Sequence, residues 1–122
     1  MRRTRGMIQP LTDVRESAMK EDMGLYEILS HVSMPECSLR IIRMLEQEHV
    51  AAHYHENCAQ IYTVLEHEVE ARVGDHTLRL RPYETVRIEK GVVHSVRTLR
   101  GEALVLSLSI PPLDPDDQHP AE

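Results

Sequence analysis

Two histidines separated by a single residue, His53 and His55, are the side chains of this sequence best suited to chemistry. Residues two apart on a β-strand point to the same face, so their imidazoles would lie close enough to chelate one metal ion. Gln60 follows after a short link, and His94 follows a glycine-containing turn. Imidazoles on neighbouring strands leave open coordination positions, as catalytic metal sites require. We therefore predict a divalent transition metal, Fe, Ni, Zn, Cu or Mn, at His53, His55, Gln60 and His94.

A competing interpretation assigns these histidines no metal. The chain contains eight histidines, and a pair with this spacing arises readily by chance in such a sequence. The predicted strands around the pair, and the turn before His94, favour the metal site over an accidental cluster.

The elements that position these residues are short and rich in β-forming side chains. From Leu25 onward such runs alternate with turn residues, and Gly74-Asp75 is a typical two-residue hairpin turn. No connection after Leu25 is long enough for a crossover helix, so the sheets must be antiparallel. We predict an all-β jelly-roll barrel, that is, a double-stranded β-helix. The predicted strands are 26–29, 38–45, 50–55, 60–66, 68–73, 77–80, 85–88, 92–96 and 103–110.

The two ends of the chain are expected to lie outside this barrel. Residues 1–24 are predicted to form an N-terminal arm or a short helix, with Thr12 as its cap. Residues 25–113 form the barrel, and the acidic residues 114–122 form a solvated tail.

Composition narrows the classes of function. The 122 residues carry 14 Lys and Arg against 20 Asp and Glu, a net charge of −6, which argues against a nucleic-acid partner. Apolar runs are too short for a membrane helix, and the basic N-terminus lacks the apolar stretch of a secretory signal. Cys37 and Cys58 suit free thiols better than a disulfide framework, so a cytoplasmic location is expected.

The region from residue 36 to 117 resembles the cupins, small β-barrel proteins with two sequence motifs. The first motif reads G-x5-H-x-H-x3–4-E-x6-G and the second G-x5-P-x-G-x2-H-x3-N. The matching positions are His53, His55 and Gln60, the strand Tyr62–Glu66, then Pro82, Gly91 and His94, and finally the ending Pro111–Asp117.

The departures from these motifs bear on both turns and chemistry. Motif glycines are replaced at Gln47, His67 and Tyr83, and the final asparagine is replaced at Thr98. The motif glutamate is Gln60, so a bound cation would keep its full charge and attract anionic substrates.

The resemblance implies a metal-binding cupin that acts on a small molecule, as a dioxygenase, isomerase or lyase, with Gln60 as a weak ligand or hydrogen-bond donor. Tyr62 lies on the same strand face as Gln60, so it would point inward. There it would be either a catalytic proton donor or a side chain that only packs in the barrel wall. The alternatives are a non-catalytic module that binds or senses a small ligand, and a metal-free structural dimer. We also expect a homodimer, because unpaired sheet edges favour association and the segment 25–32 could pack on a second copy.

Overall fold

The structure is a computed structural model that describes residues 26–45 and 49–121. The expected arm or helix at residues 1–24 lies outside the described residues. No helix in the described ranges is long and apolar enough to cross a bilayer.

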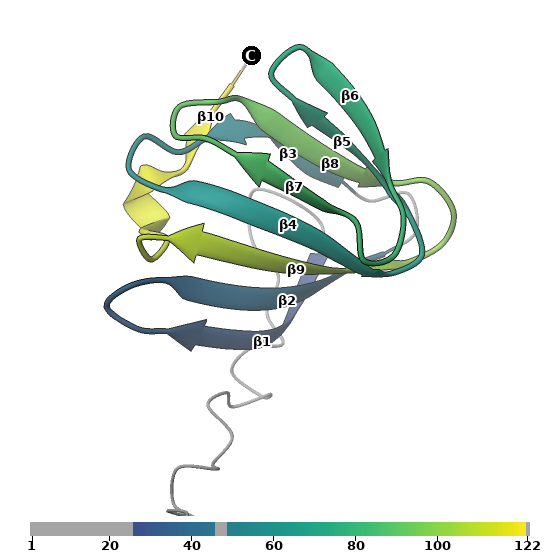
Figure 1. Cartoon of the computed structure of the whole chain (residues 1–122), viewed down its shortest axis with the longest axis horizontal. Coiled ribbons are helices and arrows are strands. Elements are labelled where there is room, and N and C mark those ends of the chain that lie inside the picture. Colours follow the sequence, from purple (N-terminus) through teal and green to yellow (C-terminus); the bar gives the residue numbers. More distant parts are fainter. Residues whose placement is uncertain (1–25, 46–48, 122) are drawn as a thin grey trace, which may run out of the picture.

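Two five-stranded antiparallel sheets face each other and enclose the interior (Figure 1). One sheet has the order β1-β2-β9-β4-β7 and the other the order β10-β3-β8-β5-β6. The prediction of an all-β jelly-roll barrel is confirmed. The strands are β1 (Tyr26–Ser33), β2 (Ser38–Met44), β3 (His49–Tyr54), β4 (Ala59–Glu66), β5 (Val69–Val73), β6 (His76–Leu80), β7 (Thr85–Ile88), β8 (His94–Thr98), β9 (Ala103–Ile110) and β10 (His119–Pro120).

The predicted strand limits agree with these to within a few residues. Strand β3 ends at Tyr54, one residue before the predicted limit, and β8 begins at His94 rather than at Val92. The β5–β6 hairpin turns at Gly74, which has a φ of 58°, and Val73 pairs with His76 across it. This left-handed backbone is the one that a two-residue hairpin turn requires and that glycine adopts readily.

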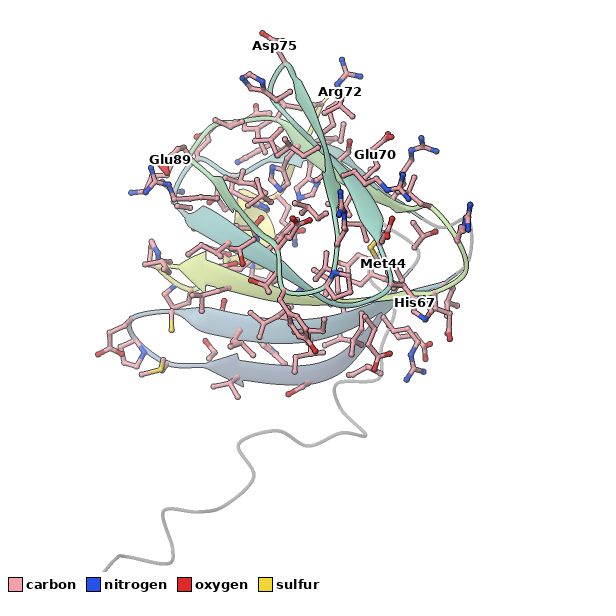
Figure 2. All side chains as sticks on the ribbon, turned by 45° about the vertical axis from the view of Figure 1, so that its right-hand side comes forward. Met44, His67, Glu70, Arg72, Asp75 and Glu89 are labelled. Carbon is pink, nitrogen blue, oxygen red and sulfur yellow. The ribbon has the colours of Figure 1, made fainter. Side chains whose placement is uncertain are left out.

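Alternation of inward and outward side chains builds the core between the sheets. Met44 and Val64 are fully buried, whereas Glu70 and Asp75 point away from the interior (Figure 2). On β9 the inward positions are the smaller residues Ala103, Val105, Ser107 and Ser109. The leucines of β9 therefore lie on the outer face of their sheet.

Two motif glycines are replaced by residues that keep a glycine-like backbone. His67 has a φ of 64° and Tyr83 a φ of 73°, both in the left-handed region. A side chain there costs about 1–2 kcal/mol relative to ordinary backbone angles. The turns of the barrel are therefore kept at a small cost in stability.

The end of the chain differs from the expected solvated tail. A 3-10 turn, η2 (Pro115–Asp117), packs against the barrel, and Asp117 is 4% exposed. Strand β10 then pairs with β3, with His119 opposite Tyr54. This segment is ordered because the Asp117 carboxylate and the β10 backbone both find hydrogen-bond partners on the barrel.

Candidate metal centre

Three imidazoles meet where β3 and β8 run side by side. His53 pairs with His94 in the β3–β8 register, and His55 follows two residues later on the same side. All three rings are buried. Their centroids lie 4.2 Å apart for His53 and His94, 4.8 Å for His53 and His55, and 5.3 Å for His55 and His94. The structure thus brings together the three histidines that the sequence singles out.

Each ring is held by a hydrogen bond from Nδ1 to a backbone carbonyl. His53 Nδ1 lies 2.7 Å from the Ala51 oxygen, His55 Nδ1 lies 2.8 Å from the Asp117 oxygen, and His94 Nδ1 lies 3.0 Å from the Val92 oxygen. A carbonyl oxygen only accepts, so these partners assign the hydrogen to Nδ1 and leave the lone pair on Nε2. This is the arrangement in which metal-binding histidines are usually oriented.

The Nε2 atoms of His55 and His94 are buried and have no hydrogen-bond partner among the described residues. The ligand atoms of the three histidines lie within 4.8 Å of one another. A buried polar atom without a partner costs about 1–3 kcal/mol, and a cation that accepted these lone pairs would remove that cost. The cluster of His53, His55 and His94 could therefore hold a divalent metal.

The electrostatic surroundings keep the imidazoles of His53 and His94 neutral. Burial lowers the pKa of His94 to about 3, and repulsion from the neighbouring His53 adds to this effect. Burial also lowers the pKa of His53, although the hydrogen bond to Ala51 opposes the change. Neutral imidazole is the form that binds metal, so His53 and His94 are in the binding form at neutral pH.

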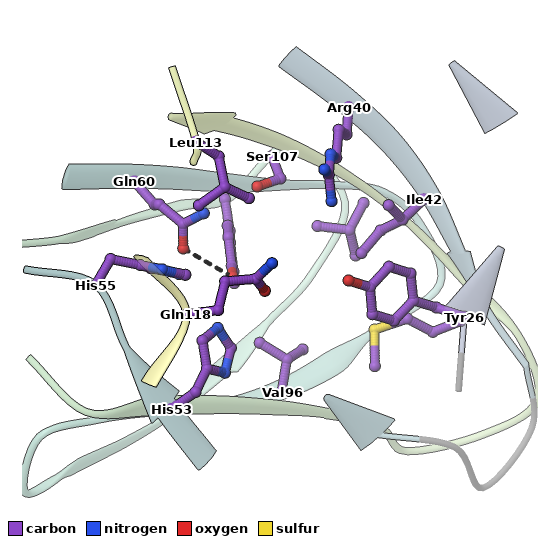
Figure 3. Close-up of a pocket in the computed structure, with 13 residues that line it drawn as sticks. Tyr26, Arg40, Ile42, His53, His55, Gln60, Val96, Ser107, Leu113 and Gln118 are labelled. Carbon is purple, nitrogen blue, oxygen red and sulfur yellow. Dashed lines mark hydrogen bonds between the residues drawn. The ribbon is translucent and has the colours of Figure 1, made fainter. Parts of the chain in front are cut away.

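Gln60 lies on the inward face of β4 and is 3% exposed. Its Nε2 donates to Ser109 Oγ at 2.9 Å, and its Oε1 accepts from the Tyr62 hydroxyl at 3.1 Å. Figure 3 shows the Gln60 amide directed into the same cavity as His53 and His55. A second lone pair on Oε1 is available in principle to a ligand, because a carbonyl oxygen can accept two bonds.

Tyr62 is also inward-facing, and its ring lies edge-on to His94 with centroids 5.9 Å apart. Burial raises the pKa of its phenol. The hydroxyl is therefore protonated at neutral pH and acts as a hydrogen-bond donor to Gln60.

Asp117 is a residue of this region whose role sequence reasoning missed. Its carboxylate accepts from the backbone amides of Glu56 and Asn57, each at 2.9 Å, while its carbonyl accepts from His55. A single residue thus anchors the link after β3 and orients one imidazole. The resemblance of residues 111–117 to a cupin ending was the available signal.

The turn before His94 is hydrogen-bonded to the backbone of His55. Gly91 has a φ of 78°, and its amide donates to the His55 carbonyl at 2.6 Å. Because this hydrogen bond joins the two motif regions, the position of His94 depends on that of His55.

Cys58, His55 and Asp117 form a second cluster whose ligand atoms lie within 4.8 Å of one another. Burial, followed by the charge of Asp117, raises the pKa of the Cys58 thiol to about 11, so the thiol stays protonated. The Asp117 carboxylate already accepts hydrogen bonds from two backbone amides and from the His119 ring. The histidine cluster is therefore the better candidate for a metal. Glu56, the nearest carboxylate in sequence to the histidine pair, is exposed.

A cavity of about 30 Å³ opens beside the histidines, enough for roughly two water molecules. Polar groups of Arg40, Gln60 and Ser107 line one side of it, and His53 and Val96 lie on the opposite side (Figure 3). The lining includes Tyr26, Arg40, Ile42, Met44, His53, His55, Gln60, Tyr62, Val96, Val105, Ser107, Leu113 and Gln118.

Comparison with known proteins agrees with this fold. The sequence profile of the cupin domain matches residues 40–111, more than half of the chain, so the protein belongs to the cupin family. No curated protein matches the sequence.

Several solved structures share the fold at low sequence identity. The protein TT1209 from Thermus thermophilus is 22% identical with a TM-score of 0.69, covering 86% of this chain and 100% of its own. A predicted oxalate decarboxylase from Thermotoga maritima is 15% identical with a TM-score of 0.69, covering 81% and 96%. Streptomyces PAC13 with uridine is 10% identical with a TM-score of 0.73, covering 91% and 89%. At these identities the likeness establishes the fold alone.

Proposed function

We propose that this protein binds one divalent transition metal through the Nε2 atoms of His53, His55 and His94. The observation that carries the proposal is the pair of buried Nε2 atoms, on His55 and His94, that lack partners among the described residues while every Nδ1 is held by a carbonyl. Three imidazole ligands suit Fe, Ni, Zn, Cu or Mn better than a hard cation such as Ca²⁺.

In this proposal Gln60 is a weak fourth ligand through Oε1, or a hydrogen-bond donor to a molecule at the centre. Its bonds to Tyr62 and Ser109 hold the amide in the cavity in either role. A neutral ligand set leaves the charge of the ion uncompensated.

The protein would then be a metal-dependent enzyme for a small molecule, of the dioxygenase, isomerase or lyase type. A bound divalent metal would act as a Lewis acid toward an oxygen of the substrate. Among this chain's own residues, Tyr62 is the proposed catalytic group: its hydroxyl proton is held toward Gln60 and lies beside His94, where it can be donated to a reacting oxygen.

A non-catalytic binding module is the second candidate. The described lining of the cavity has no aspartate or glutamate that could act as a general base, which favours binding without turnover. Consumption of oxygen or loss of substrate in the presence of the loaded protein would exclude this candidate.

Elemental analysis of protein made without a histidine tag tests the metal site. We expect about one transition metal per chain, and at least a tenfold loss of metal affinity in both His53→Ala and His94→Ala. The exposed His76→Ala on β6 is the matched control and should keep full occupancy. Protein that stays metal-free after reconstitution with each ion, or a loss in one of the two variants alone, would contradict the proposal.

We also propose a homodimer formed through the sheet that contains β1. Outward side chains of that sheet form an apolar ladder in which Leu39 and Ile61 both pair with Leu108, and Ile41 pairs with Leu106. All are half-buried, and β1 is the edge strand beside them. A second copy of the same sheet would cover this ladder with like apolar groups.

Light scattering tests the dimer. We expect twice the chain mass of 14.0 kDa at micromolar concentration, and a shift toward monomer in Leu106→Glu. Thr77→Glu, an exposed change of the same charge on β6 of the other sheet, is the control. A wild-type mass of one chain would end the idea.

A further inference from the structure

An arginine points into the barrel, where an aliphatic residue would be the ordinary choice. Arg40 shares the inward face of β2 with Ser38, Ile42 and Met44. In the β2–β9–β4 register it lies in one row with Ser107 and Tyr62, because Arg40 pairs with Ser107 and Ser107 pairs with Tyr62. The next row along these strands contains Gln60. Arg40 is thus one row away from the proposed metal centre.

The guanidinium group reaches the cavity that the histidines border. Figure 3 shows the nitrogen atoms of Arg40 and the hydroxyls of Ser107 and Tyr26 directed toward the space beside His53 and His55.

The charge of the lining limits what this end of the cavity can bind. Arg40 is the single lysine or arginine in the described lining. One guanidinium with neighbouring hydroxyl donors matches a carboxylate, which it can hold by two parallel hydrogen bonds.

We infer that Arg40 binds the carboxylate of a small organic acid whose other end, an oxygen function, faces the cluster of His53, His55 and His94. This inference rests on the proposed function, because it assigns the substrate class of that same site. The polar groups of Ser107 and Tyr26 complete the carboxylate end. Arg40 is then a specificity-determining residue.

Three probes separate the two ends of the site. Glycolate carries a carboxylate and a hydroxyl and can reach both ends, and glycolamide is its neutral counterpart. Azide is a small anion directed at the metal alone. Binding of each is measured by calorimetry on cobalt-loaded protein, with cobalt content determined in the same samples.

We expect Arg40→Met to weaken glycolate binding about tenfold to a hundredfold, the usual effect of removing a hydrogen-bonded charge. Azide affinity and metal content should stay within about twofold of wild type, because Arg40 does not bind the metal. Arg40→Lys should recover part of the glycolate affinity, since it restores the positive charge but not the planar group that makes two parallel hydrogen bonds. Arg43→Met, an outward-facing change on the same strand, is the matched control and should leave both probes unchanged.

Equal losses of glycolate and azide binding in Arg40→Met would mean that the substitution disturbs the fold or the electrostatic potential of the whole site. That result would overturn the inference. Unchanged glycolate affinity, or equal wild-type affinity for glycolate and glycolamide, would also overturn it. If wild-type protein takes up no metal, the proposed function fails. The carboxylate site is then judged separately by NMR titration of metal-free wild type and Arg40→Met with glycolate, where equal shifts would reject Arg40 as its ligand.

Discussion

The two ends of the barrel interior differ sharply, although the same strands build both. At one end β2 contributes Ile42 and Met44, and β9 contributes Ala103 and Val105 opposite them. Two to four residues further along, the same two strands contribute Ser38 and Arg40 opposite Ser109 and Ser107. Each strand therefore changes from apolar to polar along a single inward face.

The second sheet follows the same division. His94 lies between Val73 and His53 at the polar end, whereas Val96 and Ala71 pair with each other at the apolar end. The side chains of the apolar half are buried, and those of the polar half include buried nitrogen atoms without partners among the described residues. Residues of both halves border the cavity. Stability and binding are thus separated along the strands rather than between the sheets.

The largest expected effect tests whether the apolar half carries the stability. Met44 is fully buried, so Met44→Ala should lower the free energy of unfolding by about 2–5 kcal/mol through lost contacts and the cavity left behind. Urea denaturation of metal-free protein measures the loss. Met34→Ala, at a residue 48% exposed, should change it little. Metal affinity should remain that of wild type, and a parallel loss of metal binding would show that the two halves are not separable.

A pH dependence of intermediate size tests whether the polar half costs stability. Burial lowers the folded-state pKa of His94 to about 3, while the unfolded chain keeps a value near 6.5. Between these values the unfolded state binds a proton that the folded state does not. Stability of metal-free protein should therefore fall as the pH drops below about 6.5, by up to about 1.4 kcal/mol per pH unit for this group.

In His94→Ala this contribution is absent, so its free energy of unfolding should decline less steeply from pH 6.5 toward about 4 when measured with a chelator present. His76→Ala, which removes an exposed imidazole on β6, should keep the wild-type slope. Identical slopes in wild type and His94→Ala would show that the buried imidazole imposes no such cost.

The smallest effect lies outside both halves, at a turn. Tyr83 is 82% exposed and has a φ of 73°, so Tyr83→Gly should relieve left-handed strain while adding some entropy to the unfolded chain. We expect a net stabilisation of less than about 1 kcal/mol by urea denaturation. Tyr83→Ala keeps a β-carbon and should bring no gain. A stabilisation by alanine equal to that by glycine would locate the effect in the exposed ring instead.

The sequence predicted the residues whose positions follow from local spacing. His53 and His55 point to the same face because they are two residues apart. His94 lies beside them because the strand that follows the glycine turn pairs with β3. The pattern of short strands predicted the barrel, and the short link after His55 placed Gln60 beside them. These features need no knowledge of distant packing.

Other features could not be predicted because they depend on distant partners. Strand β2 carries apolar residues on both faces, so nothing in its pattern shows that Arg40 points inward. On β9 the large residues Leu104 and Leu106 lie on the outer face, and the smaller Ser107 and Ser109 leave room for Gln60 and Tyr62. Hydrophobicity alone favours the opposite face.

The hydrogen bond between His55 and Asp117 spans 62 positions of the chain, and this separation has a consequence for biosynthesis. All three imidazoles leave the ribosome before residue 117 does. An incomplete chain can therefore possess every proposed ligand while His55 still lacks the acceptor that orients it. Uptake of metal would become favourable late, when η2 docks beside β3. A truncation before residue 117 would then be detected first as poor metal retention by a barrel that still folds.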